Sequence, residues 1–302
     1  AAKYNHGIRR QYELGKWFRI RYGSFLPETY SPNDIYVRSS DKDRTLMSAE
    51  ANLAGLYPPK KSQIWNQKLS WRPIPIHTVR EEEDKVIAMK KECPKYEIWY
   101  DQLLNSKFFE NINEQNKNLY KYLSENTGWN ITTVREIETL YSLFSIERES
   151  NLTLPTWTQG IFPEKLEFLA ALSHASFSFT KQLARLISGP FFDYLFSHFD
   201  NITNNSSTKK FLMLSGHDNT IVNILSAMGL YDYKCPEFAS TIIWELRQNE
   251  NDSYINLFYK NKVTLTKLKL FGCDMNCNYS RFKHILETVT VNEKNWNKEC
   301  LV

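Results

Sequence analysis

The chain contains two places where side chains able to do chemistry directly follow short apolar runs. His217 and Asp218 come after Phe211–Leu214 and a Ser-Gly break, and Arg38 comes after Ile35–Val37. Neighbouring imidazole and carboxyl groups serve in proton transfer, and an arginine binds two oxygens of one phosphate group. The pattern therefore favours reactive groups at the ends of two strands, with Arg38 suited to bind a phosphate group. The alternatives are a surface His-Asp loop and a surface ion pair of Arg38.

The segments around these residues predict an α/β sheet that carries them at one edge. The run before His217 is short and apolar, as in a strand buried on both faces, and Thr220–Met228 has apolar residues at helical spacing. A second helix is predicted from Asp41 or Asp43, with a carboxylate as its N-cap, and it ends at Pro58–Pro59. Strand, glycine turn and helix in this order present reactive groups at the carboxyl edge of a sheet.

The sequence changes character between about residues 81 and 207, where helical patterns alternate with polar loops and strand-like runs disappear. We therefore predict an α/β core over residues 1–80, an inserted helical cap over 81–207, and a second part of the core over 208–302. The other predicted elements are a helix over Arg9–Tyr22, a sheet-edge strand over Arg72–Val79, helices over Pro163–Ile187 and Phe191–Phe199 separated by Ser188–Pro190, and a hairpin of strands over Ser240–Leu246 and Tyr254–Tyr259.

The composition, with 42% hydrophobic and 24% charged residues, is that of a soluble globular protein. The net charge is only +4 and no dense Lys/Arg cluster is present, so we expect a pocket for a small anion and no nucleic-acid partner. No apolar run approaches the roughly 20 residues of a membrane span, so no membrane attachment is expected. The chain begins at Ala1 almost directly on a helix and without a signal peptide, which predicts a processed or truncated start.

The cysteines and glycosylation sequons favour the secretory pathway. Five cysteines are present, so at least one stays unpaired if the others form disulfides. Each Asn-x-Ser/Thr sequon is weak evidence alone, but together with the cysteines they indicate a secreted protein or one of the lysosomal lumen. The predicted glycosylation sites are Asn130, Asn151, Asn201, Asn204, Asn205, Asn251 and Asn278.

The segments at the predicted site resemble the histidine acid phosphatases. Arg38–Ala49 is similar to that family's strand–arginine–helix segment, and Gly216–Asp218 to its late His-Asp motif. The likeness covers nearly the whole chain and is nearest to the secreted branch of prostatic, lysosomal and insect venom enzymes, the venom enzymes first. It implies an α/β core with a largely parallel sheet flanked by helices, plus an inserted helical cap. Further similar segments are Tyr12–Gly15, Leu56–Pro59, Arg72–Val79, Leu152–Trp157 and Gly272–Cys273.

The resemblance implies a two-step phosphoryl transfer. A histidine attacks a phosphomonoester, and water then hydrolyses the phosphohistidine, while cationic groups hold the equatorial oxygens. By position, Arg38 is a phosphate clamp and His217 is both a catalytic and a phosphate-binding residue. Asp218 is the general acid that protonates the leaving oxygen, which suits an acidic pH optimum. No metal or cofactor is implied, and a homodimer is a further expectation.

The sequence departs from the family at the nucleophile, which belongs to an R-H-G-x-R motif at the end of the first strand. Asn5–Arg9 mimics that motif, but too few residues precede His6 for a buried strand, so His6 is a poor candidate. The first strand and its nucleophile are thus expected to be missing. The chain is either a fragment of an active phosphatase, which the retained Arg38, His217 and Asp218 favour, or an inactive secreted homologue that binds phosphate-bearing ligands. A phosphoglycerate-mutase-like intracellular enzyme is disfavoured by the cysteines and sequons.

The resemblance also implies the disulfide pairing. Cys93 and Cys300 match a long-range bridge, and Cys273 and Cys277 match a short-loop bridge. Metal binding by the second pair is the alternative, but no further Cys/His pair completes a tetrahedral set. Cys235 is left over, and a free thiol is expected there.

Overall fold

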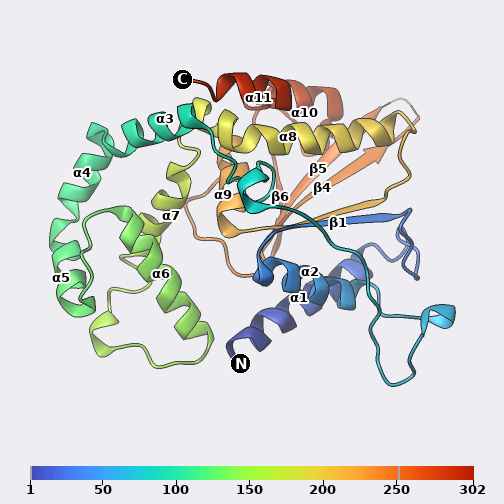
Figure 1. The fold of residues 1–302 in the computed structure, drawn as a ribbon, viewed down its shortest axis with the longest axis horizontal. Helices are drawn as coiled ribbons and strands as arrows, with labels where there is room; N and C mark the ends of the chain where they lie inside the picture. The colour runs from blue at the N-terminus through green and yellow to red at the C-terminus, as the bar shows by residue number, and fades with distance from the viewer. Residues whose placement is uncertain (1, 251) are drawn as a thin grey trace. The chain divides into compact units, whose positions relative to one another are not determined.

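The computed structural model describes residues 2–250 and 252–302, which form two compact units (Figure 1). The first unit contains residues 1–92, 191–221 and 237–286, and the second contains 93–190, 222–236 and 287–302. The strands lie in the first unit, and the second is helical. The α/β class with a helical domain is therefore confirmed. This division differs from the predicted boundaries at residues 80 and 207, because 81–92 and 191–207 join the first unit while 222–236 and 287–302 join the second.

The first unit combines two sheets with helices that pack beside them. Its elements are α1 (Ala2–Arg21), β1 (Ile35–Ser40), α2 (Asp43–Leu56), η1 (Lys61–Gln63), β2 (His77–Val79), η2 (Glu81–Glu83), the second half of α8 (Lys181–Thr203), β3 (Phe211–Ser215), the start of α9 (Asp218–Ala227), β4 (Thr241–Gln248), β5 (Ser253–Lys260), β6 (Leu265–Leu268), β7 (Cys277–Asn278) and α10 (Tyr279–Leu286).

Only one of the two sheets is parallel. Strands β2, β1 and β3 lie side by side in that order and run parallel, with β2 at the edge as the prolines before it predicted. In the other sheet β5 pairs antiparallel with β4, β6 and β7. The predicted hairpin is confirmed by β4 and β5, whose register runs from Thr241 opposite Lys260 to Gln248 opposite Ser253.

Strand β3 is found where it was predicted, but it is not buried on both faces. All five residues of Phe211–Ser215 are half-buried. Within the described residues, β3 has β1 as its ladder partner on one edge and no partner on the other. A strand at a sheet edge leaves its side chains and one row of its backbone groups less covered than a central strand does.

Helices α1 and α2 lie side by side through two glycines (Figure 1). A Cβ atom added at Gly15 would overlap the carbonyl oxygen of Asn52, and one at Gly55 would overlap the carbonyl oxygen of Tyr12. The glycines therefore allow the two backbones to touch. The predicted carboxylate cap of α2 is wrong, because the N-cap residue is Lys42 and no side chain caps this helix.

The second unit is an assembly of helices around its own apolar core. Among the described helices, none combines the length and the apolar character needed to cross a lipid bilayer. The elements are α3 (Pro94–Leu104), α4 (Lys107–Gln115), α5 (Lys117–Thr127), α6 (Val134–Glu149), η3 (Thr156–Thr158), α7 (Glu167–Ser176), the first half of α8, the second half of α9 and α11 (Glu293–Glu299).

Helix α8 corrects two sequence predictions. The helix predicted over Pro163–Ile187 is divided between α7 and α8, and α8 then runs through Pro190 without a break. A proline inside a helix leaves the carbonyl four residues earlier without its N–H partner. Here that carbonyl, of Leu186, accepts the indole Nε1–H of Trp296 at 2.7 Å instead. A side chain from α11 therefore compensates for the proline, and the helix continues.

Both predicted disulfides are present. Cys93 and Cys300 are bridged with their Cα atoms 4.7 Å apart, and Cys273 and Cys277 with theirs 5.2 Å apart. The first bridge joins the start of the second unit to its C-terminal segment. Cys235 is in neither bridge, and its thiol donates to the carbonyl oxygen of Glu167 at 3.8 Å.

Candidate active site

The two segments predicted to carry the site lie at the carboxyl ends of neighbouring parallel strands. In the ladder between β1 and β3, Arg38 is opposite Leu214. Ser215, the last residue of β3, is followed directly by Gly216 and His217 at the start of α9. Both segments therefore reach the same edge of the sheet, as the sequence indicated.

Arg38 is held in a buried ion pair. Its Nη2 donates to Oδ1 of Asp84 at 2.7 Å, and its guanidinium carbon lies 5.5 Å from the centre of the Tyr194 ring. Arg38 is 9% exposed and Asp84 is 0% exposed, so the alternative of a surface ion pair is wrong. Arg38 also lies inside β1, which continues to Ser40, and not at its end. The buried Nε of Arg38 has no hydrogen-bond partner among the described residues, so the guanidinium keeps an unsatisfied donor.

The imidazole of His217 is held at both ring nitrogens. The Oγ of Ser40 lies 2.9 Å from Nε2, and Nη2 of Arg44 lies 3.3 Å from Nδ1. An arginine only donates, so Nδ1 accepts, and the neutral ring carries its hydrogen on Nε2. Nε2–H therefore donates to Ser40, while the Nδ1 lone pair faces Arg44.

This tautomer orders the hydroxyl groups beside it. Because Ser40 accepts from His217, its own hydrogen is directed to Oγ1 of Thr45, which is 2.8 Å away. Thr45 in turn donates to the carbonyl oxygen of Lys42 at 2.9 Å. Ser40 and Thr45 are both buried. The end of β1 and the first turn of α2 thus fix the orientation of the imidazole.

The surroundings of His217 favour its neutral form. Burial lowers the pKa of His217 below the ordinary histidine value, and the nearby charges of Arg44 and Lys90 lower it further, whereas Asp218 and Glu81 partly oppose these effects. A positive cluster that disfavours an imidazolium favours an anion for the same electrostatic reason. The same charges would attract a negatively charged ligand to this end of the sheet.

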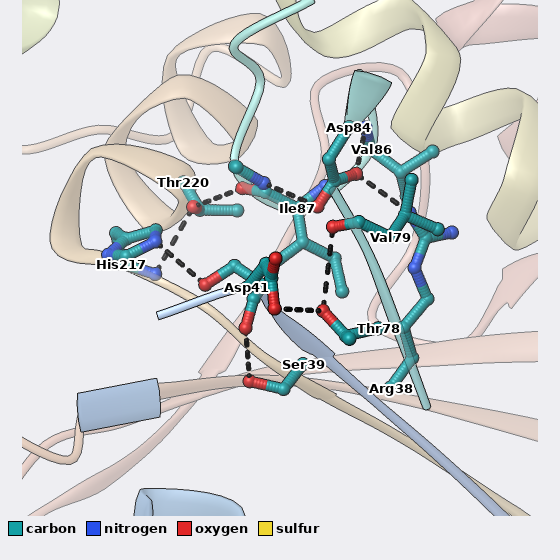
Figure 2. Close-up of polar contacts among 12 residues, drawn as sticks. Arg38, Ser39, Asp41, Thr78, Val79, Asp84, Val86, Ile87, His217 and Thr220 are labelled. Carbon is teal, nitrogen blue, oxygen red and sulfur yellow. Dashed lines mark hydrogen bonds and ion pairs between the residues drawn. The ribbon is translucent and has the colours of Figure 1, made fainter. Parts of the chain in front are cut away.

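The backbone of the His-Asp loop is tied to the turn after η2 (Figure 2). The hydroxyl of Thr220 accepts the backbone N–H of His217 at 3.2 Å and donates to the carbonyl oxygen of Ile87 at 2.8 Å. A Cβ atom at Gly216 would lie 2.8 Å from Cγ2 of Ile87, so glycine is the residue that fits there. The Ser-Gly break in the sequence therefore reflects a close approach of two loops.

Asp218 is the first residue of α9 and is exposed. Its Oδ1 accepts the backbone N–H of Asn219 at 2.8 Å. A carboxyl group at this position lies beside His217 and has access to water. The structure therefore places the Asp218 carboxyl in an exposed position next to His217.

The other histidines considered in the sequence lie apart from these contacts. His6 is on the exposed side of α1, not at the end of a strand. His77 is in the edge strand β2, opposite Arg38 in the ladder, and its ring stacks on Tyr36 with centroids 4.7 Å apart. His77 is exposed and in contact with a neighbouring aromatic ring.

The sequons are mostly accessible. The asparagine is exposed at each of Asn130, Asn151, Asn201, Asn204 and Asn205. Asn278 is half-buried, and its Nδ2 donates to Asp252 at 3.3 Å. Asn251 lies outside the described residues. No group of three or more His, Cys, Asp or Glu side chains suited to a metal ion occurs in residues 2–250 and 252–302.

Four residues of the site were not assigned a role from the sequence: Ser40, Arg44, Asp84 and Thr220. Ser40 and Arg44 follow Arg38 closely, in the segment that leads into the second helix. Their nearness in the sequence to the end of the strand could have indicated that they belong to the site. Asp84 follows three glutamates and has the pattern of a solvated acidic turn, which hid its burial. Its three backbone partners are local, but its ion pair with Arg38 depends on tertiary packing that the local sequence does not encode.

A family model connects this site to known proteins. The model of the histidine phosphatase superfamily (branch 2) matches residues 4–260. The match includes both strands of the site and the His-Asp loop. The chain therefore belongs to branch 2 of the histidine phosphatase superfamily, as the resemblance of its motifs predicted.

Curated relatives extend the match beyond the site. The chain is 33% identical to the prostatic acid phosphatase of Rattus norvegicus over 302 residues, covering 98% of this chain and 79% of the relative. It is 34% identical to the lysosomal acid phosphatase of Rattus norvegicus over 304 residues, covering 97% of this chain and 71% of the relative.

Solved structures share the fold at lower identity. The phytase of Hafnia alvei in complex with myo-inositol hexakis sulphate has a TM-score of 0.69 at 16% identity, over 97% of this chain and 87% of the phytase. The phytase of Citrobacter braakii has a TM-score of 0.68 at 17% identity, over 98% and 88% of the two chains. At this identity the likeness concerns the fold alone.

Proposed function

We propose that this protein is an acid phosphatase that hydrolyses phosphomonoesters through a phosphohistidine intermediate. The observation that carries the proposal is that Arg38 and His217 belong to neighbouring parallel strands at one sheet edge, where Ser40, two residues after Arg38 in β1, contacts His217. Both groups are cationic or able to become so, and both are held by buried partners. The acid phosphatases among the curated relatives support the same reaction class.

In the proposed reaction the protein supplies charge and position. Arg38 and His217 hold the nonbridging oxygens of the phosphoryl group, where negative charge is concentrated in the transition state. A histidine nitrogen forms a bond to phosphorus as the ester P–O bond breaks, and Asp218 gives its proton to the leaving oxygen. In the second step Asp218 takes a proton from water, which attacks phosphorus and releases the histidine.

The tautomer of His217 makes phosphate binding depend on proton uptake. With Nε2–H donating to Ser40, Nδ1 is an acceptor that faces Arg44 in the free protein, and a ligand bound at Nδ1 would replace that contact. A phosphate oxygen is also an acceptor, so Nδ1 must gain a proton before it can donate to the ligand. Binding of the anion therefore favours the imidazolium, and acidic pH favours binding.

The nucleophile is proposed to come from the R-H-G-x-R segment of the family, which residues 1–302 do not contain. His6 is exposed on α1, and His77 is stacked on Tyr36. The β3 edge that has no ladder partner among the described residues is a suitable place for the strand that would carry this segment. A phosphohistidine formed there would be next to His217.

The second candidate is an inactive homologue that binds phosphate-bearing ligands, which the positions of His6 and His77 favour. The retained Asp218 argues against this second candidate, because a carboxylate beside an anion site weakens anion binding.

We further propose a secreted or lysosomal-lumen location, N-glycosylation at the exposed sequons and a homodimeric state. The two disulfides support the location.

The test is hydrolysis of 4-nitrophenyl phosphate by the polypeptide as its natural source makes it. The proposal predicts turnover at acidic pH that is inhibited by orthovanadate, and a loss of at least about 100-fold in kcat/KM for Arg38→Gln and His217→Ala. Arg80→Gln is the matched control, since Arg80 is an exposed arginine paired with Glu82. A wild-type protein that binds vanadate without turnover would establish the second candidate instead.

A further inference from the structure

The carboxylate of Asp84 accepts more hydrogen bonds than is usual for an acidic residue at the surface. Its Oδ1 accepts from Nη2 of Arg38 at 2.7 Å, and from the backbone N–H groups of Val86 at 3.0 Å and Ile87 at 3.1 Å. Its Oδ2 accepts the backbone N–H of Ala88 at 3.1 Å. A fully buried carboxylate is very unfavourable unless it is paired and hydrogen-bonded, and here both conditions are met.

One carboxylate thereby fixes two different structures (Figure 2). On one side it holds the guanidinium of Arg38, and on the other it closes the turn that contains Val86 and Ile87. Three backbone N–H groups that point at one carboxylate leave the turn with little freedom. Any displacement of Asp84 would move both structures.

The closed turn reaches the second half of the site. The carbonyl oxygen of Ile87 accepts the Thr220 hydroxyl, which accepts the backbone N–H of His217. The side chain of Ile87 also occupies the space where a Cβ of Gly216 would lie. A continuous series of contacts thus runs from Arg38 through Asp84 and the turn to the backbone of His217.

We propose that Asp84 is a positioning residue that sets the geometry of both phosphate-binding groups, Arg38 directly and His217 through the turn at residues 86–88. This inference rests on the proposed function, because the geometry matters only if the two groups bind one phosphoryl group. Asp84 does not touch the substrate. It acts through Arg38 and through the backbone.

If Asp84 positions Arg38, its loss should weaken the binding of vanadate and of phosphate to different extents. A planar arrangement of equatorial oxygens, as in bound orthovanadate, needs the guanidinium in one orientation, whereas tetrahedral inorganic phosphate tolerates a looser one. Asn at position 84 keeps an oxygen for the N–H groups of Val86 and Ile87 but loses the charge that holds Arg38. The loss should therefore be greater for vanadate than for phosphate.

The experiment is calorimetric titration of orthovanadate and inorganic phosphate into the natural polypeptide and four variants at one acidic pH. We expect Asp84→Asn to weaken vanadate binding about 10-fold and phosphate binding by no more than about 3-fold. In a protein that already carries Arg38→Gln, Asp84→Asn should change vanadate affinity by less than about 3-fold, because the guanidinium that Asp84 holds has already been removed.

Asp34→Asn is the matched control. Asp34 is partly buried and forms an ion pair with the exposed Lys210 at 3.0 Å, at the opposite end of β1 from the site. The Asp34→Asn variant should be less stable than the wild type, but the ratio of its vanadate affinity to its phosphate affinity should be unchanged. If Asp84→Asn does not fold, Thr220→Val tests the same connection from its other end. We expect this variant to bind vanadate about 3- to 10-fold more weakly. An unchanged vanadate affinity would overturn the proposal.

The outcomes separate this inference from the proposed function. A wild-type protein that binds neither anion overturns the function and this inference with it. Wild-type binding combined with an Asp84→Asn effect that is equal for both anions, or that adds fully to Arg38→Gln, overturns the positioning role alone.

Discussion

The Oγ of Ser40 lies 2.9 Å from Nε2 of His217, and this contact joins the last residue of β1 to the loop after β3. It orients an imidazole that comes from a segment more than a hundred residues away, since the two residues are 177 positions apart. Because the hydroxyl accepts from Nε2, the other ring nitrogen, Nδ1, is the one that faces Arg44. In the proposed function, this serine therefore determines that Nδ1 is the nitrogen that binds the anion.

Ser40→Ala should leave Nε2–H buried without an acceptor and allow the ring to turn. An unsatisfied buried donor costs about 1–3 kcal/mol, so we expect vanadate affinity to fall at least about 5-fold. Ser48→Ala is the control, since its hydroxyl bonds only within α2, to the carbonyl oxygen of Arg44 at 2.7 Å. Equal vanadate affinity of Ser40→Ala and wild type would contradict the account of the tautomer.

Arg44→Gln should raise the pKa of His217, because it removes one of the charges that lower it and leaves Asp218 and Glu81, which raise it. The measurement is an NMR titration of the histidine ring protons, with His217→Gln used to assign the resonance. Arg9→Gln, a change of an exposed arginine on α1, should leave that titration unmoved. An unchanged pKa in Arg44→Gln would show that the guanidinium does not influence the ring.

The lowered pKa of His217 also predicts how stability depends on pH. The folded protein resists protonation that the unfolded chain accepts at its ordinary pKa of about 6.5, so the unfolded state binds more protons below that pH. The contribution of His217 to stability is therefore full above about pH 6.5 and is lost as pH falls towards its folded pKa. The free energy of unfolding, measured with urea between pH 7 and pH 5, should fall less steeply in His217→Gln than in the wild type. Parallel curves for the two proteins would contradict the predicted loss of stability on protonation of His217.

Asp218→Ala should separate anion binding from proton donation. Removal of a carboxylate next to the site should tighten inorganic phosphate binding a few-fold, while turnover of an alkyl phosphate should fall by about 100- to 10,000-fold because its leaving group needs a proton. A 4-nitrophenyl leaving group needs that proton less, so its turnover should fall less. Asp232→Ala, an exposed acid, is the control. Equal losses for both substrates would rule out Asp218 as the proton donor.

The contact of α1 with α2 can be tested with two alanine substitutions in one helix. Gly15→Ala should destabilise the fold by about 1–3 kcal/mol or more, since its Cβ would overlap the backbone of α2. Gly7→Ala should stabilise it by about 0.5–1 kcal/mol, since nothing lies within 4 Å of that Cβ and alanine is the better helix former. Chemical denaturation that gave both variants the same stability would contradict this packing.

Local sequence patterns were enough to predict the parts of the fold that depend on short-range signals. The runs before Arg38 and His217, the hairpin across residues 248–253 and the edge position of β2 all follow from periodicity and proline placement. The pairing of the cysteines and the family itself came from resemblance of motifs, and both are confirmed. The nearness to insect venom enzymes stays a prediction.

At two places a tertiary contact outweighs the local signal. Pro190 would end an isolated helix, but Trp296 supplies the missing hydrogen bond to Leu186. Asp84 has the sequence environment of a solvated acid, but Arg38 and three N–H groups make its burial favourable. Trp296 and Arg38 are both far in the sequence from the residues they contact, so no local pattern could indicate these two contacts.

The most direct test of the central claim is to quench turnover of ³²P-labelled aryl phosphate by the natural polypeptide and to locate the label. The account predicts a label on a histidine, stable in base and lost in acid, in a peptide that carries an Arg-His-Gly-x-Arg sequence. It also predicts that Arg38→Gln and His217→Ala abolish the labelling. Turnover without any labelled histidine, or labelling that survives both substitutions, would contradict the mechanism.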